Sequence, residues 1–358
     1  MLKEKMVFVG VGQCGGNIVR EFEELGFNAF YINTSSEDLE QIDTDISLKY
    51  SVPNSGGCAK DRALAQQYTV KYFREMMGVI DSRFSTSTII TLVYSLGGGT
   101  GGGTSNMLLD IMSNENPEKT YNVIAVLPDE HETMLIQKNA FDSLKELNKL
   151  EFVNSVFLLD NNKVSDKMDI NSQIAILFDN IVNANNSDKK GCFDRVEIEK
   201  SITEKGYSVL LETETEDDPK VGVAKSIKES MFATWVNDCN TLGYTINARN
   251  RKEEIAFKNA LYEEFGTPYV DFTGFNPDSN TNIVIASGMS FNSSILNELA
   301  ERYNKLMDKK KKENTETKVE DITLEDIGVK SIKQSRQPVK KEDKRKRLDD
   351  IFAKYNTK

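Results

Sequence analysis

The chain has 358 residues, enough for two domains with a sizeable core. Its hydrophobic content of 39% and charged content of 28% are typical of a soluble globular protein. No apolar run approaches the roughly 20 residues that a membrane-spanning helix needs. Four widely spaced cysteines and one histidine argue against a disulfide framework, a zinc site and histidine-based catalysis.

Charge is distributed unevenly along the chain. Residues 308–358 hold 16 Lys/Arg against 11 Asp/Glu, a net charge of +5, so the total of −11 leaves −16 for residues 1–307. An acidic body with a basic tail is poorly suited to gripping DNA, so we expect no direct specific DNA binding by the folded body. We also expect no membrane partner. The N-terminus runs directly into an apolar segment without a signal sequence, which predicts a cytoplasmic protein.

Short apolar runs recur in the first half of the chain, at 6–9, 29–32, 88–94, 121–127 and 155–159. Continuous apolar strands that alternate with helical segments indicate a parallel sheet covered by helices on both faces. In such a fold, ligands bind at the carboxyl ends of the strands. Polar clusters follow those ends at 10–17, 33–36, 97–104, 128–132 and 160–162.

The first polar cluster satisfies the pattern GxGxxG after a strand, which is compatible with a dinucleotide-binding oxidoreductase. Such an enzyme holds the ribose with an acidic residue after the second strand, where this chain has Asn33-Thr34-Ser35 instead. No GxxxxGK[ST] sequence occurs, so a P-loop enzyme is excluded.

A second glycine-rich segment, at 97–104, follows the strand predicted at 88–94 and precedes a helical segment. Each of its six glycines weakens a regular element by roughly 0.5–1 kcal/mol relative to alanine. That cost is tolerated where the backbone must approach a ligand closely. Consecutive amides before a helix N-terminus form a phosphate site. Two such loops favour a mononucleotide triphosphate over NAD.

The second half of the chain predicts a long helix and a smaller α+β region. A helix from about 166 to 185 carries Ile170, Ile174, Leu177 and Ile181 on one face. We then expect helices at 197–205, 224–232 and 252–265, and strands at 207–211, 269–273 and 282–286. The domains predicted are a Rossmann-like nucleotide-binding domain at 1–165, a central helix and connecting loop at 166–190, a second α+β domain at 191–290, a C-terminal helix at 291–312 and a largely disordered basic tail at 313–358.

The two glycine-rich loops together resemble those of the tubulin/FtsZ superfamily. Gly12-Gln13-Cys14-Gly15 is similar to the first loop of tubulins, and 97–104 is similar to the GGGTG(S/T)G signature that tubulin and FtsZ share. The resemblance covers most of residues 5–307 and implies the tubulin/FtsZ fold. It also implies the cofactors GTP and Mg²⁺, GTPase activity that assembly stimulates, and filaments in which subunits associate head to tail.

The resemblance, with the position of each strand end, gives the nucleotide-binding residues. The segment 55–60 stands where the γ-phosphate-sensing loop belongs, and Asn161 where an asparagine reads the guanine edge. By counted offset along the central helix, Phe178 stacks on the base and Asn183 makes a second base contact. No side chain is expected to bind Mg²⁺ directly, because phosphates and water hold the ion near Gln13 and Thr100. The complete set is Gly12, Gln13, Cys14, Asn17, Asn33, Gly57, Ala59, Lys60, Gly97, Gly98, Gly99, Thr100, Gly101, Gly102, Pro128, Glu132, Asn161, Phe178 and Asn183.

Asp194 and Glu197 are the catalytic residues that the resemblance implies. Family members place the motif D-x-x-(D/E) here, on a loop that reaches the nucleotide of the next subunit. Hydrolysis requires a group that orients water in line with the γ-phosphate. The alternative is that Asp194 caps the following helix and Glu197 completes a capping box. His131 and Glu132 follow Pro128-Asp129 at a strand end, where they either approach the ribose or form a solvated loop.

Several segments depart from FtsZ and tubulin. Lys60-Asp61 does not follow the asparagine-proline pattern of FtsZ, and the C-terminus lacks the apolar peptide that docks FtsZ to its membrane tethers. These departures and the basic tail most resemble the TubZ group of plasmid and phage tubulins, and suggest a clostridial phage. That group segregates DNA in a bacterial host, which implies an adaptor on a centromere-like DNA site. The alternatives are an FtsZ-like cell-division GTPase and, more distantly, the oxidoreductase.

Overall fold

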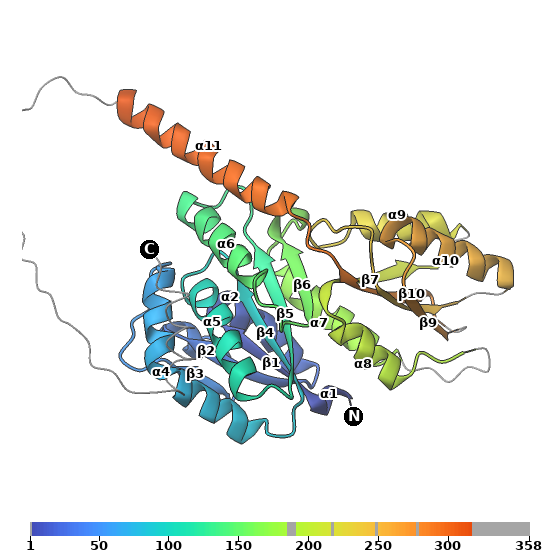
Figure 1. Ribbon diagram of the computed structural model, residues 1–358, viewed down its shortest axis with the longest axis horizontal. Coiled ribbons are helices and arrows are strands. Elements are labelled where there is room, and N and C mark those ends of the chain that lie inside the picture. Colours follow the sequence, from blue (N-terminus) through green and yellow to red (C-terminus); the bar gives the residue numbers. More distant parts are fainter. Residues whose placement is uncertain (1, 185–190, 216–217, 248–249, 277–278, 317–358) are drawn as a thin grey trace, which may run out of the picture.

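The computed structural model describes residues 2–184, 191–215, 218–247, 250–276 and 279–316. The strands are β1 (Met6–Val11), β2 (Asn28–Asn33), β3 (Lys49–Ser51), β4 (Ile89–Ser95), β5 (Thr120–Leu127), β6 (Ser155–Asp160), β7 (Gly206–Glu214), β8 (Thr241–Ile246), β9 (Val270–Phe275) and β10 (Thr281–Met289). Within the described ranges they form one ten-stranded sheet of order β3-β2-β1-β4-β5-β6-β7-β10-β8-β9 (Figure 1).

Helices cover the sheet on both faces, as the alternating apolar runs predict. The α-helices are α1 (Leu2–Lys5), α2 (Gly12–Glu24), α3 (Ser36–Glu40), α4 (Arg62–Arg83), α5 (Thr100–Glu115), α6 (Met134–Leu147), α7 (Asp169–Val182), α8 (Arg195–Thr203), α9 (Pro219–Lys228), α10 (Arg251–Phe265) and α11 (Ser294–Glu316), with short 3₁₀ turns η1 (Ile46–Leu48) and η2 (Asn161–Lys163).

The strands from β3 to β7 are parallel, and β1 is buried along its whole length. Its side chains alternate between two cores. Met6 and Phe8 pack with α2 and α7 on one face, and Val7 and Val9 pack with α4, α5 and α6 on the other. A central strand that is buried on both faces has a continuous hydrophobic sequence, which explains the apolar run at 6–9.

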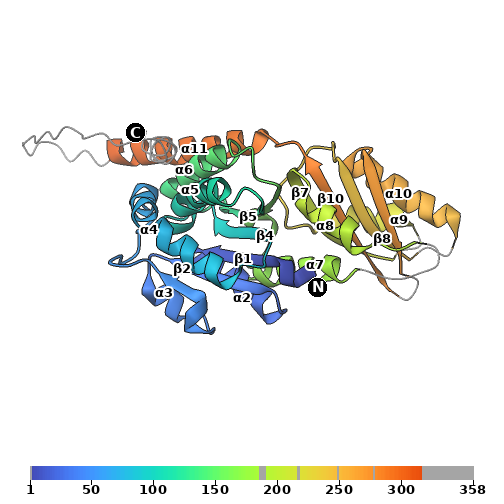
Figure 2. The same ribbon diagram turned by 60° about the horizontal axis from the view of Figure 1, so that its bottom comes forward.

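The second region continues the same sheet. β6 pairs with β7 in parallel through Ser155 and Gly206, and β10 is antiparallel to both β7 and β8. The α+β order predicted there is confirmed, but β8 was not expected from the sequence. Figure 2 shows α9 and α10 beside each other at the end of the molecule opposite α4, and α11 along α6.

Several boundaries differ from the sequence expectation. The central helix α7 has 14 residues rather than about 20, because Asp166 accepts the Met168 amide in a turn before the helix. The last helix continues to Glu316, so residues 313–316 belong to α11 and not to the tail. The rest of the predicted tail, 317–358, and most of the connecting loop, 185–190, lie outside the described residues. In the part of the chain that the structure describes, no helix has the length and apolar character to cross a membrane.

Candidate nucleotide-binding site

A cavity of about 390 Å³ opens at the carboxyl edge of the sheet. Its walls are the segments that directly follow β1, β2, β4, β5 and β6, together with the loop between β3 and α4. The predicted residues that line it are Gly12, Gln13, Cys14, Asn33, Gly57, Ala59, Lys60, Gly97, Gly98, Gly99, Thr100, Gly101, Pro128, Glu132 and Asn161. The carboxyl ends of the parallel strands therefore surround a cavity, as expected from the polar clusters that follow them in the sequence.

Two helix N-termini and a close backbone packing make this cavity suited to phosphate. α2 begins at Gly12, which has a φ of +74°, and α5 begins at Thr100. Both therefore direct unpaired amides and a partial positive charge toward the cavity. A Cβ on Gly99 would lie 2.7 Å from the Lys60 Cα atom, so only glycine lets the two loops approach this closely.

A cluster of small polar side chains joins three of the cavity loops. The hydroxyl oxygens of Thr34 and Thr100 lie 2.6 Å apart, and the Cys58 thiol donates a hydrogen bond to Thr34 Oγ1 at 3.3 Å. Thr34 and Cys58 line the cavity and belong to the predicted loops, although neither was predicted individually as a binding residue. Burial raises the pKa of the Cys58 thiol and that of the Cys14 thiol, the latter to about 12. Both thiols are therefore neutral at physiological pH, which suits packing and not nucleophilic chemistry.

The rim of the cavity is held by ion pairs. Lys167 Nζ lies 2.6 Å from Glu132 Oε1 and 3.3 Å from Asp129 Oδ2. Partial burial raises the pKa of Asp129, but its hydrogen bond from the His131 amide and the charge of Lys167 outweigh burial and hold the pKa below its usual value. Asp160 accepts the Asn162 amide at 2.9 Å and thereby begins the turn η2, which presents Asn161 to the cavity.

The prediction that Phe178 stacks on a base is wrong. Its side chain has no exposed surface and does not line the cavity. Three core rings surround it at centroid distances of 4.8–5.7 Å: Phe8, Phe22 and Phe157. A fully packed ring has no face free for a nucleobase. Along the chain, the part of α7 closest to the cavity-lining Asn161 is its first turn, which carries the buried Asn171, and not the turn that carries Phe178.

Three other predicted residues also lie away from the cavity lining. Asn183 is the C-cap of α7, and its side-chain amide donates to Asp179 at 3.0 Å. Asp179 forms an ion pair with Lys3, which places this end of α7 near the start of β1. Asn17 lies half-buried on α2. Gly102 is buried in α5, where a Cβ would meet the Leu96 carbonyl oxygen at 2.5 Å, so its role is close packing.

Asp194 and Glu197 form the capping box that was the alternative interpretation. Asp194 Oδ1 accepts the amides of Val196 and Glu197, and Glu197 Oε2 accepts the Asp194 amide at 3.0 Å. Neither residue lines the cavity. Their helix is fixed near the amino end of β1 by an ion pair between Lys5 and Glu199. The acidic pair and the cavity therefore lie at opposite edges of the sheet.

The residues present fit a nucleotide-bound metal ion better than a metal site made of protein ligands. No group of three or more His, Cys, Asp or Glu side chains converges on a point within the described ranges. The cavity does present Asp38, Glu132 and the paired threonine hydroxyls. Mg²⁺ commonly retains several waters and is bound through one or two carboxylates together with substrate phosphates.

Comparison with known proteins agrees with this geometry. Residues 5–169 match the family "Tubulin/FtsZ family, GTPase domain", and residues 197–290 match "Tubulin-like protein TubZ, C-terminal domain". The tubulin-like protein TubZ of Clostridium botulinum C phage is 31% identical over 99% of this chain and all of its own length. The chain belongs to the TubZ family. It is a tubulin-type GTPase with a GTP-binding domain, and the predicted superfamily, fold and cofactor GTP are confirmed.

Solved structures of TubZ proteins have the same fold. The C-terminally truncated TubZ of Clostridium botulinum phage c-st superimposes with a TM-score of 0.79 at 31% identity, over 86% of this chain and all of that one. The GTPγS-form protofilament of Bacillus thuringiensis serovar israelensis TubZ gives a TM-score of 0.76 over 88% of this chain and 94% of that one. At 13% identity, the second comparison establishes the fold alone. Because the chain belongs to the TubZ family, the alternative interpretation as a dinucleotide-binding oxidoreductase is excluded.

Proposed function

We propose that this protein assembles head to tail into a GTPase filament and that Asp194 and Glu197 of one subunit complete the catalytic site of the next. The observation that carries the proposal is the placement of the cavity and the acidic pair at opposite edges of one sheet. β1, which runs between those edges, has six residues and is about 20 Å long. Within one subunit, the acidic side chains cannot reach the nucleotide.

A head-to-tail contact removes this separation. When the amino edge of one subunit lies on the carboxyl edge of another, α8 faces the open cavity. Such a contact joins two different surfaces, and it builds a filament when the rotation does not close a ring. Val196, between the two acidic residues, is 75% exposed and supplies apolar surface for this contact. A TubZ from Bacillus thuringiensis that shares this fold forms protofilaments, which is compatible with assembly of this kind.

The proposed hydrolysis of GTP follows from the charged groups at the carboxyl and amino edges of the sheet. The helix N-termini and loop amides would hold the phosphates, and a Mg²⁺ ion bound with the nucleotide would supply positive charge that stabilises the charge developing during hydrolysis. Asp194 and Glu197 of the neighbour orient the attacking water. Since bound GTP then contributes to the subunit contact, GTP favours assembly, and hydrolysis removes that preference.

We infer that the filament positions or segregates plasmid or phage DNA in the cytoplasm of a bacterial host. The net charge of −16 over residues 1–307 opposes direct DNA binding by the body, so an adaptor on a centromere-like DNA site is required. Full-length similarity to a phage TubZ favours this cargo over the cell-division role.

Turnover measured against protein concentration tests the shared site. Phosphate release per subunit should rise steeply above the concentration at which the protein pellets with GTP. A second test mixes Glu197→Gln with Gly99→Ala, whose GTP binding we expect to be weaker, at a GTP concentration that saturates only the first variant. Each variant alone should hydrolyse GTP slowly under these conditions, and the mixture should partly recover activity, because the second variant offers an intact acidic pair to the first. A flat activity profile and no recovery on mixing would contradict the proposal.

A further inference from the structure

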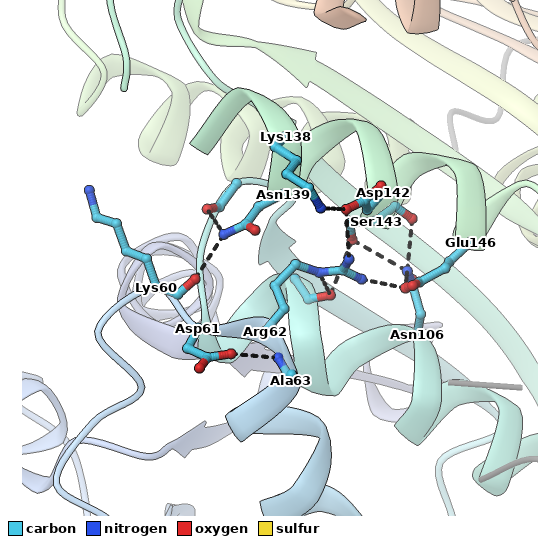
Figure 3. A network of polar contacts seen from close by, with 12 residues as sticks. Lys60, Asp61, Arg62, Ala63, Asn106, Lys138, Asn139, Asp142, Ser143 and Glu146 are labelled. Carbon is cyan, nitrogen blue, oxygen red and sulfur yellow. Dashed lines mark hydrogen bonds and ion pairs between the residues drawn. The ribbon is translucent and has the colours of Figure 1, made fainter. Parts of the chain in front are cut away.

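A network of polar contacts lies beside the cavity and includes residues that the proposed mechanism does not use (Figure 3). It connects Arg62 at the start of α4, Asn106 in α5 and several side chains of α6. The α6 members are Asn139, Asp142, Ser143 and Glu146. Helix α6 also contributes Ile136 to the cavity wall.

Asn139 connects the two loops that hold phosphate from opposite sides. Its side-chain amide, only 5% exposed, donates to the Lys60 carbonyl oxygen at 2.9 Å and to the Gly97 carbonyl oxygen at 3.2 Å. Lys60 and Gly97 both line the cavity, whereas Asn139 does not. One amide nitrogen therefore sets the spacing between the loop at 57–61 and the glycine loop.

The loop at 57–61 needs such support because its backbone is unfavourable. Ala59 and Lys60 have φ values of 45° and 66°, a left-handed conformation that residues with a Cβ rarely adopt. Strained backbone persists when surrounding contacts hold it in place. Figure 3 shows the Lys60 side chain pointing away from the network, so Asn139 contacts the Lys60 backbone and leaves its ammonium group outside the network.

Helix α6 is itself a fixed support. Arg62 Nε donates to the Gly102 carbonyl oxygen at 3.0 Å, and its guanidinium pairs with Glu146 of α6. Asn106 of α5 donates to the Ser143 carbonyl oxygen at 2.8 Å. These contacts lock α6 to the helix that follows the glycine loop, so the position of Asn139 is determined before nucleotide binds.

We propose that Asn139 is a positioning residue for GTP binding and turnover: it holds the two phosphate loops at the spacing that a triphosphate requires. It acts through the Lys60 and Gly97 carbonyls and does not touch the nucleotide. The inference depends on GTP binding in this cavity but not on the sharing of catalysis between subunits. Measurements on unassembled protein therefore separate the two proposals.

The test removes the hydrogen-bond donor of the Asn139 side chain while keeping the shape of that side chain. Asn139→Asp removes the NH₂ group and places an anionic oxygen against two carbonyl oxygens. Asn148→Asp, the same change at the C-cap of α6, is the matched control, because Asn148 contacts Leu144 and Tyr207 and not the loops. Below the assembly concentration, we expect the Kd for GTP to rise about tenfold or more in Asn139→Asp and to stay unchanged in the control. KM should rise while kcat at saturating GTP is retained.

Hydrogen exchange distinguishes positioning from general destabilisation. Amides at 57–61 should exchange faster in Asn139→Asp, with the amides of α6 still protected. Asn139→Ser, which deletes the amide with less disturbance, gives the same readout if the aspartate variant does not fold. Parental GTP affinity and parental exchange at 57–61 in either folded variant would overturn the proposal.

Discussion

Lys5, immediately before β1, forms an ion pair with Glu199 of α8, and its Nζ lies 2.6 Å from Glu199 Oε2. This contact fixes α8 at the edge of the sheet where the parallel strands begin. The glycine loops lie where the same strands end. The distance between the acidic pair and the cavity in one subunit is thus a consequence of strand direction, and under the proposed mechanism a single subunit is incomplete for hydrolysis.

Glu197→Gln should bind GTP and assemble normally but turn over GTP about 10²–10⁴-fold more slowly. Glutamine still accepts the Asp194 amide, so it preserves the capping box while it removes the charge that we propose orients water. Phosphate release and pelleting measure the two properties separately. Asp218→Asn, at the N-cap of α9, is the control for neutralising a helix cap and should leave turnover unchanged. Parental turnover in Glu197→Gln would mean that the residue is only a cap.

Gly99→Ala should weaken GTP binding by about tenfold or more while the protein stays folded. The added Cβ meets the Lys60 backbone at 2.7–2.9 Å, so the two phosphate loops must move apart. A Cβ at Gly56, in the same loop region, meets no atom within 4 Å, so Gly56→Ala is a matched control with expected parental affinity. Titration with a fluorescent GTP analogue, together with circular dichroism, checks both. Equal affinities in the two variants would show that the loop spacing does not matter.

Those parts of the site that depend on strand direction and local sequence could be predicted. Glycine runs after apolar strands predicted two loops that line the cavity, because parallel strands end at one edge of the sheet. Asn139 could not be found in this way. It contacts Lys60 and Gly97, which lie 79 and 42 positions away in the sequence. No local sequence pattern indicates a contact between elements so far apart.

Phe178 shows a different limit of sequence reasoning. Counting along the helix assigned it to the base, yet Ile174, Phe178 and Ile181 follow the spacing i, i+4, i+7 of one buried face. The periodicity was the better guide, because core packing determines which face of α7 is buried. The Asp166 side chain accepts the Met168 amide and stabilises a turn, so α7 begins at Asp169 and not at the predicted position near 166.

Phe178→Leu should lower the free energy of unfolding by about 1–3 kcal/mol and leave the GTP affinity of the folded protein unchanged. The loss follows from the cavity that opens among the neighbouring rings. Ile176→Ala on the same helix, at a side chain that is 47% exposed, should change stability much less. Urea denaturation and GTP titration are the measurements. Reduced GTP affinity with parental stability would instead support a role in base stacking.

Glu146 gives a pH-dependent prediction for the network around Asn139. Burial raises the pKa of its carboxyl, and the nearby Asp142 adds to this rise, although the Arg62 guanidinium and the Asn106 amide oppose it. Because the folded pKa lies above the unfolded value, the native state binds the proton more tightly. The stability from this group is therefore fully present below the unfolded pKa, about 4.3, and is lost as the pH rises through the folded pKa.

Glu146→Gln removes this titration while it keeps the size of the side chain. Urea denaturation from about pH 4.5 to 7.5 should show the free energy of unfolding of the parent falling relative to that of the variant as the pH rises. Arg62 is charged throughout this range, so the trend reports the protonation of Glu146. A difference that grows in favour of the parent with rising pH would mean that the ion pair with Arg62 outweighs the cost of burying the carboxylate.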